Sequence, residues 1–352
     1  MPGTVRPLAA LSLVAACALA LTACGSSGGG STAPTASGTA LAGQSITVYS
    51  GQHEQTVKAL TEDFTKRTGI KVELRSGDEA ELANQILQEG GASPADVFYA
   101  ENPPALTVLG DKGLLAKVAP DTLKSVPAAD SSGKGDWVGI SARTSAFLAA
   151  TGKGADTAPP ASVLDLAKPE WKGRLGIAPG ETDFAPVVTQ VLKAKGEDAA
   201  KQWLKGLKDN AKVYDSNEDL SVAINSGEVE AGVIDHYYFY RMRDEKGAAE
   251  THATLHYFPK GDPGSLVDVS GAAVLKHGKH QAAAQAFLGY LASAPAQTVI
   301  ADSASYEYPL VDGVKGKPEL PALDGIGTVA DPAQLGDGKQ ALALLQDAGL
   351  LQ

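Results

Sequence analysis

Short β-branched segments alternate with segments of helical periodicity along most of the chain, and this alternation restricts the fold more than any other feature. Ser45–Tyr49 has the composition of a strand, and Thr56–Thr68 then places apolar residues at helical spacing until Gly69 ends the helix. Repeated alternation of this kind is typical of parallel strands covered by helices, so we expect an α/β fold. The same pattern predicts strands at 70–74, 96–99, 175–178 and 231–234, and helices near 82–89, 199–207, 220–225, 281–292 and 340–348.

The length of the chain is sufficient for two hydrophobic cores. It has 352 residues, of which 43% are hydrophobic and 20% charged, and a single domain of that size would be unusually large. We therefore expect two α/β lobes with a ligand cleft between them, and hinge strands around Trp137–Phe147 and Leu266–Val274. The predicted boundaries place the N-lobe at 45–145 and 268–317 and the C-lobe at 146–267 and 318–352.

The N-terminus has the features of an export signal. Arg6 precedes an apolar run, Leu8–Leu21, which leads into Leu21-Thr22-Ala23-Cys24. That tetrapeptide resembles a bacterial lipobox, which implies a signal peptide at 1–23 and a lipid carried by Cys24. A transmembrane helix is the alternative, but an apolar run of about 14 residues is short for a hydrocarbon core of about 30 Å. We therefore expect an extracytoplasmic protein anchored by lipid to the bacterial cell membrane.

The segment after the leader predicts a flexible linker, and the remaining composition excludes several classes of site. Residues 24–44 are rich in Gly, Ser, Thr and Ala, with little to bury. Cys17 lies in the leader, so the mature chain retains only Cys24 and has no disulfide, zinc thiolate or catalytic thiol. A net charge of −11 disfavours nucleic acid as a partner. The sequence motifs of P-loop proteins, HExxH metalloproteases and GxSxG hydrolases are absent.

Polar clusters follow three of the predicted strands at the point where each strand ends. They read Ser50-Gly51-Gln52-His53, Ala100-Glu101-Asn102 and Asp235-His236-Tyr237-Tyr238. In open α/β sheets ligands bind outside the carboxyl ends of the strands, so all three clusters are expected at one cleft. Taken singly, each residue also has an ordinary role: His53 as a cap, Glu101 as an acid at a helix N-terminus, and the tyrosines in an amphipathic stripe.

As a set, the candidate ligands favour a hard and highly charged metal ion. His53, Glu101, Tyr237 and Tyr238 offer one imidazole nitrogen, one carboxylate and two phenol oxygens, without sulfur, which disfavours soft metals. If both phenols ionise, three negative charges match Fe³⁺ and overcompensate a divalent ion. A phenol with a pKa of about 10 ionises near neutral pH only beside a strongly polarising cation. These four donors leave two positions of an octahedron for water or a small anion.

Several segments resemble the ferric-ion-binding proteins of bacterial ABC transporters, the iron-transferrin-like substrate-binding proteins. The similarity extends from about residue 45 to residue 311, and the segments that carry it are Val48–His53, Ala95–Glu101, Asn225–Tyr238 and Val269–Val274. The resemblance implies a two-lobed periplasmic-binding-protein-like fold in which Fe³⁺ is held between the lobes by His53, Glu101, Tyr237 and Tyr238. It also implies a monomer without enzymatic activity that delivers iron to the transmembrane subunits of an ABC permease.

The anion site of that family is matched only in part. The family holds a synergistic anion with a small-residue turn at a helix N-terminus and with two asparagines. Asn217 matches one asparagine, but the other position is Asp235, and the turn carries Glu181, Thr182 and Asp183. These extra acids should repel phosphate, so we expect water, carbonate held by Arg143, or one of the acids to fill the open positions.

Two other functions are compatible with the same residues. A two-lobed receptor for an organic anion, such as a phosphonate or carboxylate, would use Arg143 and Ser141 in the cleft. A ferric non-haem enzyme would use two Tyr and two His ligands, with His236 as the nearby second histidine. That enzyme class predicts an all-β body, whereas the pattern of this chain is α/β.

Overall fold

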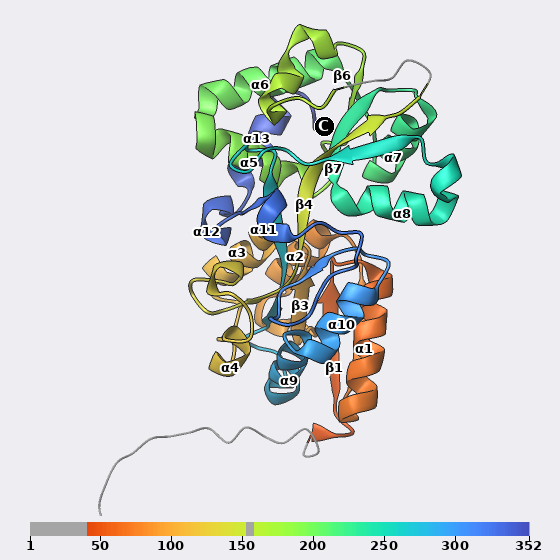
Figure 1. Cartoon of the computed structure of the whole chain (residues 1–352). Helices are drawn as coiled ribbons and strands as arrows, with labels where there is room; N and C mark the ends of the chain where they lie inside the picture. The colour runs from red at the N-terminus through yellow and green to blue at the C-terminus, as the bar shows by residue number, and fades with distance from the viewer. Residues whose placement is uncertain (1–40, 153–157, 352) are drawn as a thin grey trace, which may run out of the picture. The chain divides into compact units, whose positions relative to one another are not determined.

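The computed structural model describes residues 41–152 and 158–351 (Figure 1). The predicted signal peptide at 1–23, the predicted lipid site at Cys24 and the predicted linker as far as residue 40 lie outside the described residues. Within the described ranges, no helix is both long enough and apolar enough to cross a membrane.

The first half of the sheet comes from the N-terminal alternation of strands and helices. Its parallel strands are β1 (Ser45–Ser50), β2 (Lys71–Ser76) and β3 (Val97–Ala100). Its helices are α1 (Glu54–Thr68), α2 (Glu79–Glu89), α3 (Pro103–Asp111), α4 (Pro120–Leu123), α9 (Gln281–Leu291) and α10 (Ala294–Asp302). The α1 helix ends at Gly69, whose φ of 73° lies in the left-handed region that favours glycine, as the sequence predicted.

The second half of the sheet repeats the arrangement. Its parallel strands are β5 (Leu175–Ile177), β6 (Ala211–Val213) and β7 (Ala231–Asp235). Its main helices are α5 (Phe184–Lys195), α6 (Glu197–Asn210), α7 (Asn217–Ser226) and α8 (His236–Lys246). The C-terminal elements are α11 (Leu323–Ile326), which packs against the first core, and β11 (Thr328–Val329), α12 (Pro332–Leu335) and α13 (Lys339–Asp347). Short 3₁₀ helices lie at 90–92, 128–130, 163–167, 169–171 and 248–250.

Two long strands, β4 (Val138–Ala150) and β9 (Leu266–Val274), join the halves at the segments predicted to be hinges. The strand order is β2-β1-β3-β9-β4-β7-β5-β6, with β8 (Ala253–His256) and β10 (Tyr308–Pro309) also paired with β4. The parallel arrangement predicted for the alternating strands does not extend to the hinge strands β4 and β9. No direction was predicted for these two strands, and their pairings with β3, β7 and each other are antiparallel. Because β9 enters the first half from the second without a crossover helix before it, it is free to pair antiparallel.

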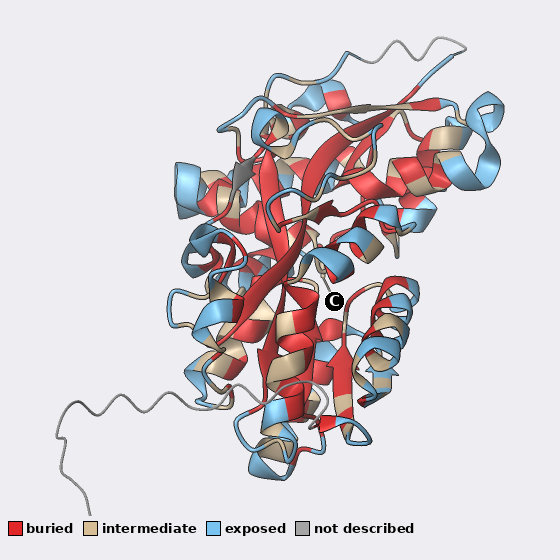
Figure 2. Cartoon of the chain, turned by 60° about the horizontal axis from the view of Figure 1, so that its bottom comes forward, coloured by how far each residue is buried: buried red, intermediate tan, exposed pale blue. Residues whose placement is uncertain are grey.

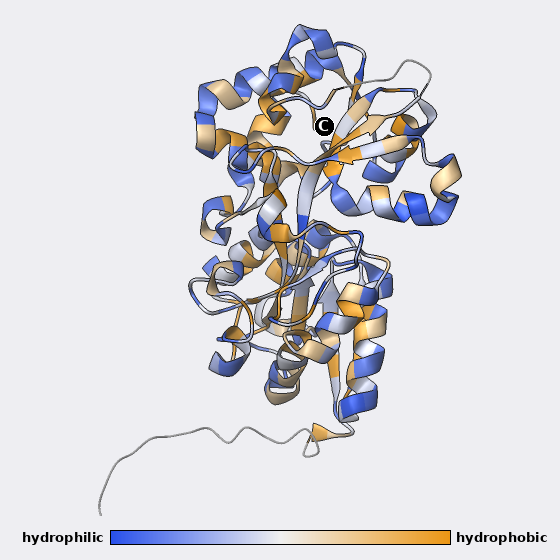
Figure 3. Ribbon diagram, viewed as in Figure 1, coloured by the Kyte–Doolittle hydropathy of each residue, from blue (hydrophilic) through white to orange (hydrophobic). Residues whose placement is uncertain are grey.

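Buried apolar side chains form separate cores on the two sides of the hinge strands. The first core includes Ile46, Phe64, Phe98, Ala142, Val267 and Phe287. The second core includes Phe147, Leu175, Trp203, Leu266 and Leu344, so the C-terminal tail packs there. A third cluster, which we call the tyrosine core, includes Leu220, Ile224, Tyr237, Tyr240 and Tyr306. The protein is thus a two-lobed α/β fold, with buried strands and exposed outer helix faces (Figure 2) that carry the hydrophilic residues (Figure 3).

Gly139 in β4 marks a close approach of two backbones at the hinge. The register of β4 against β9 shifts between Gly139 and Ala142. A Cβ atom at position 139 would lie 2.0 Å from the carbonyl oxygen of Asp130, which is backbone and has no rotamer to change.

We therefore expect Gly139→Ala to lower the free energy of unfolding by about 1–3 kcal/mol, the typical cost of overpacking. Chemical denaturation of the metal-free protein measures this change. Gly133→Ala is the matched control, because Gly133 is exposed and a Cβ there would meet nothing within 4 Å. Equal stability of the two variants would contradict the close approach.

Candidate metal centre

The residues predicted from the sequence as metal ligands follow strands that belong to the two halves of the sheet. Glu101 comes directly after β3, and His53 lies between β1 and α1; β1 and β3 are neighbouring parallel strands, so both residues lie at the same edge. Tyr237 and Tyr238 occupy the first turn of α8, directly after β7. The structure therefore gathers side chains that are 136 positions apart, as in the contact of Tyr237 with Glu101.

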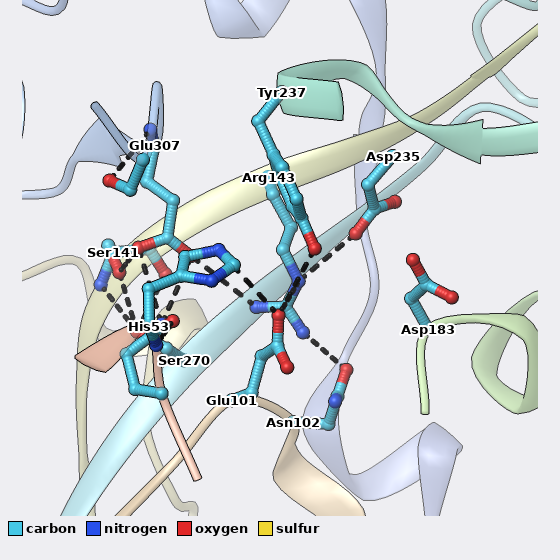
Figure 4. A network of polar contacts seen from close by, with 12 residues as sticks. His53, Glu101, Asn102, Ser141, Arg143, Asp183, Asp235, Tyr237, Ser270 and Glu307 are labelled. Carbon is cyan, nitrogen blue, oxygen red and sulfur yellow. Dashed lines mark hydrogen bonds and ion pairs between the residues drawn. The ribbon is translucent and has the colours of Figure 1, made fainter. Parts of the chain in front are cut away.

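Three of these four residues meet in one cluster (Figure 4). The Tyr237 hydroxyl donates a hydrogen bond to Glu101 Oε1 at 3.3 Å, and His53 Nε2 lies 4.0 Å from the same oxygen. The rings of His53 and Tyr237 stand edge to face, with centroids 4.9 Å apart. Tyr238 adjoins the cluster through Tyr237, since the two ring centroids are 4.3 Å apart.

The imidazole of His53 supplies an unpaired donor atom at this cluster. Its Nε2 is buried and has no hydrogen-bond partner. A buried polar atom without a partner is uncommon, because it loses water without gaining a protein hydrogen bond. An electron pair on this nitrogen, one carboxylate and two phenols fit a hard cation. The described residues contain no group of three or more His, Cys, Asp and Glu placed for a metal, so the phenols are essential to any site here.

Both phenols are held in their neutral form when no cation is present. Burial, reinforced by the neighbouring Tyr238 and by Glu101, raises the pKa of Tyr237 well above its usual range. Burial and the charge of Asp183 do the same for Tyr238. The N-terminal end of α8 favours negative charge, and the Arg241 guanidinium lies 6.0 and 5.9 Å from the two ring centroids. A metal ion must therefore displace protons from the phenols to bind them.

Arg143 lies behind these residues and is saturated with acidic partners. It is fully buried in β4, with its Nε 3.2 Å from Asp235 and 4.0 Å from Glu101. A third carboxylate, that of Glu307, lies 4.0 Å from Nη1, and Nη2 donates to the side chain of Asn102. Burial opposes the charged guanidinium, but the surrounding carboxylates outweigh it and raise the pKa of Arg143. An external anion has no access to this charge.

The turn before α5 brings three residues that the sequence predicted near an anion, Glu181, Thr182 and Asp183, close to Asn217. Asn217, at the start of α7, donates from its backbone N–H to Glu181 and from its side-chain nitrogen to both oxygens of Asp183, at 3.1 and 2.9 Å. Thr182 lies between these acids and is half-buried. Burial and the charges of Asp235 and Glu101 raise the pKa of Asp183. Asp183 faces the cluster, as Figure 4 shows.

Three buried acids around the site carry no signal in the sequence, and Gln52 has one only as a member of the polar cluster after β1. Glu79 accepts hydrogen bonds from the backbone and side-chain nitrogens of Asn102. Gln52 donates a hydrogen bond to Glu307. Asp268 lies near Arg143. Glu79 opens α2 and so looks like an ordinary helix-start acid. Glu307 and Asp268 belong to no motif. Only the fold shows that their side chains turn inward.

The fold and this arrangement define a class, the two-lobed solute-binding proteins of bacteria. The sequence pattern of a family described as bacterial extracellular solute-binding protein matches residues 46–303, and the chain belongs to that family. Its similarity to two named relatives is high over nearly the whole length. The Fe(3+)-binding periplasmic protein of Serratia marcescens is 41% identical, over 89% of this chain and 92% of the relative. The major ferric iron-binding protein of Neisseria meningitidis serogroup B is 38% identical, over 87% and 93%.

The fold of this chain is also similar to that of solved iron-binding proteins. The crystal structure of iron-bound HitA from Pseudomonas aeruginosa superimposes with a TM-score of 0.83 at 41% identity, covering 87% of this chain and 99% of that chain. Apo ferric ion-binding protein A from Pasteurella haemolytica, at 23% identity and a TM-score of 0.78, shares the fold over 87% of this chain and 98% of that chain.

The buried Glu79 gives a test of the electrostatics around the cluster. Burial and the charge of Glu101 raise its pKa from 4.5 to about 8. Between these values the unfolded chain releases a proton that the folded chain keeps, so the carboxyl lowers stability as the pH rises.

We expect Glu79→Gln to stabilise the metal-free protein, and to do so more at about pH 8 than at about pH 5. Glutamine still accepts the hydrogen bond that Asn102 N–H donates at 2.7 Å. Denaturant unfolding at both pH values measures the gain. Glu81→Gln, at an exposed position of the same helix, is the control. A gain independent of pH would argue against a protonated Glu79.

Proposed function

We propose that this protein captures Fe³⁺ between its lobes and delivers it to the permease of an ABC transporter. We name His53 and Glu101 the first half-site and Tyr237 and Tyr238 the second half-site. The observation that carries the proposal is the convergence of the unpaired His53 Nε2, the Glu101 carboxylate and the Tyr237 hydroxyl at one point. With both phenols ionised, the oxygens of Glu101, Tyr237 and Tyr238 carry three negative charges, which balance the charge of a trivalent ion. The nitrogen of His53 is neutral and adds no charge.

The relatives support ferric iron as the cargo. The two described above are named for Fe³⁺ or ferric iron, and the structure of HitA is described as iron-bound. A solute-binding protein of this kind serves transport, so we propose a carrier without enzymatic activity. We further propose that it works as a monomer held to the membrane by a lipid on Cys24, after removal of residues 1–23 and with 24–44 as its linker.

We infer lobe boundaries at the two hinge strands, as the sequence predicted. Ala142 and Val267 belong to the first core, whereas Phe147 and Leu266 belong to the second. This supports an N-lobe at 45–145 and 268–317 and a C-lobe at 146–267 and 318–352. Two parts of the chain depart from these boundaries. Tyr306 packs in the tyrosine core of the other lobe, and Leu323 and Ile326 of α11 pack against the first core.

The environment of Arg143 disfavours an organic anion as the cargo. Ser141, the second residue expected to bind such an anion, is fully buried and donates its hydroxyl hydrogen to Glu307 at 2.8 Å. Four carboxylates surround the guanidinium, and they would repel a phosphonate or carboxylate. The ferric enzyme is disfavoured as well, because both ring nitrogens of His236 already have backbone partners.

The ligand set is tested by removing one phenol oxygen at a time. Iron loading should give a phenolate-to-iron charge-transfer band and a red to orange colour. Tyr237→Phe and Tyr238→Phe keep the ring and remove the donor, so each should weaken the band. Each should also weaken the affinity by more than the roughly 10–100-fold that changing a group beside a metal ligand costs.

The measurement is a spectrophotometric titration with Fe³⁺ against a competing chelator. Tyr214→Phe is the control, because its hydroxyl lies 3.1 Å from Glu228 and outside the proposed site. Full colour and full affinity in either variant of the pair would exclude that tyrosine as a ligand.

We propose that a protein carboxylate, rather than phosphate, completes the coordination, and that Asp183 is best placed among the acids. Asn217 donates hydrogen bonds to both carboxylate oxygens of Asp183 and so fixes their position. The charge of Asp183 also raises the pKa of both phenols. Arg143 is occupied by acids, which leaves it unsuited to hold carbonate. Glu181 and Asp235 add negative charge around the same place, so a phosphate would meet Coulomb repulsion in a partly dry site.

Iron affinity should therefore depend little on added phosphate. The double variant Glu181→Ser with Asp235→Asn removes two of the repelling charges and should introduce a dependence on phosphate. Iron titrations at increasing phosphate concentration, in both proteins, measure the difference. A strong enhancement by phosphate in the unaltered protein would show that these acids do not act on the metal site.

A further inference from the structure

A two-residue segment, Tyr306-Glu307, contacts the residue that precedes each half-site. The carbonyl oxygen of Tyr306 lies 2.8 Å from Nε2 of His236. The carboxylate oxygens of Glu307 lie 3.1 and 3.3 Å from Nε2 of Gln52. Each of these two partners directly precedes a proposed metal ligand in the sequence. Consecutive residues of one segment thus hold the two half-sites at once.

On the side of the first half-site, Glu307 fixes the orientation of the Gln52 amide. Gln52 donates through Nε2 to Glu307, and its Oε1 accepts from the backbone N–H of His53 at 2.7 Å. Turning the amide over would put its oxygen against the carboxylate, so only one orientation is favourable. The carboxylate is itself fixed by the hydroxyl of Ser141 at 2.8 Å, and both Gln52 and Glu307 are buried.

On the side of the second half-site, the contacts of His236 determine its tautomer. The backbone N–H of Thr144 is a donor and lies 3.3 Å from Nδ1, so Nδ1 is the acceptor. The proton therefore resides on Nε2 and is donated to the carbonyl oxygen of Tyr306. The ring is fully buried and held at both nitrogens, which fixes the start of α8.

The segment is anchored in both lobes. Tyr306 stacks on Tyr240 in the tyrosine core, with ring centroids 5.0 Å apart, whereas Tyr308 belongs to the first core and pairs with Ala142 of β4. Tyr306 has φ of 56°, and no other non-glycine residue in the described ranges has a positive φ. Such a backbone is costly for a tyrosine and persists only where surrounding contacts hold it.

We propose that Tyr306-Glu307 sets the position of the two half-sites relative to each other, with Glu307 acting as a positioning residue for His53 through Gln52. The inference rests on the function proposed above. Without this contact, Gln52 loses its fixed orientation, and the backbone of His53 loses its hydrogen bond. The imidazole then spends less time where its Nε2 faces Glu101, and the first half-site binds iron less well.

The test compares two single variants with a swapped pair. Gln52→Ala and Glu307→Gln each should weaken Fe³⁺ binding by roughly 10–100-fold, the usual effect of removing a group that orients a ligand. The double variant Gln52→Glu with Glu307→Gln exchanges the side chains, which keeps the total charge, the hydrogen bond between them and the acceptor for His53 N–H. It should recover most of the lost affinity. The phenolate band should persist in all variants, since the second half-site is unchanged.

Affinity is measured by chelator competition, and unfolding of each metal-free variant shows that it is folded. Gln55→Ala and Glu62→Gln, both exposed, are the matched controls. If Gln52→Ala does not fold, Gln52→Asn replaces it with the same expected loss. Wild-type affinity in both single variants, or a swapped pair no better than the single variants, would overturn the inference. Absence of iron binding with a phenolate band in the unaltered protein would instead overturn the proposed function.

Discussion

The polar interior of this protein depends on one buried guanidinium. Arg143 lies in the middle of β4, between residues of the first core and residues of the second. Its acidic partners come from three segments: Glu101 after β3, Asp235 at the end of β7, and Glu307 next to β10. Removing one partner of a buried ion pair typically costs about 3–5 kcal/mol, because the other charge is left uncompensated. Charge pairing around this residue therefore fixes the segments that carry the proposed ligands.

The same interior holds more acid than this cation can neutralise. Burial raises the pKa of Asp235 to about 7, that of Asp268 to about 6 and that of Glu79 to about 8. Such carboxyls give up their protons readily when a cation arrives. The interior is thus matched to a guest of high positive charge, which agrees with a trivalent ion in the proposed site and with the poor fit of an organic anion.

The sequence was sufficient to predict an element or the position of a residue where the local pattern and the local structure agree. The periodicity that predicted a helix at Thr56–Thr68 corresponds to α1, and the rule that ligands gather at strand ends predicted that His53 and Glu101 lie at one edge of the sheet, as they do. The periodicity of apolar residues did not predict α8, because its sequence, HYYFYRMRDEK, has aromatic and charged residues on all faces and therefore no apolar stripe. The contact between Gln52 and Glu307 joins residues 255 positions apart, and no local pattern signals it. The hinge strands were predicted but their antiparallel direction was not, since their pairing depends on the path of the chain between the lobes.

The division of donors between the two lobes has a consequence for how the cargo would leave. If the lobes separate, the proposed site becomes two fragments, and each binds far more weakly than the whole. The proposed fragments are unequal: on the C-lobe the phenolates of Tyr237 and Tyr238 would carry two negative charges, to which Asp183 can add a third, whereas His53 and Glu101 would carry one. The ion would remain with the C-lobe after the first step. Its final departure then requires two protons, because both phenols are neutral in the empty protein.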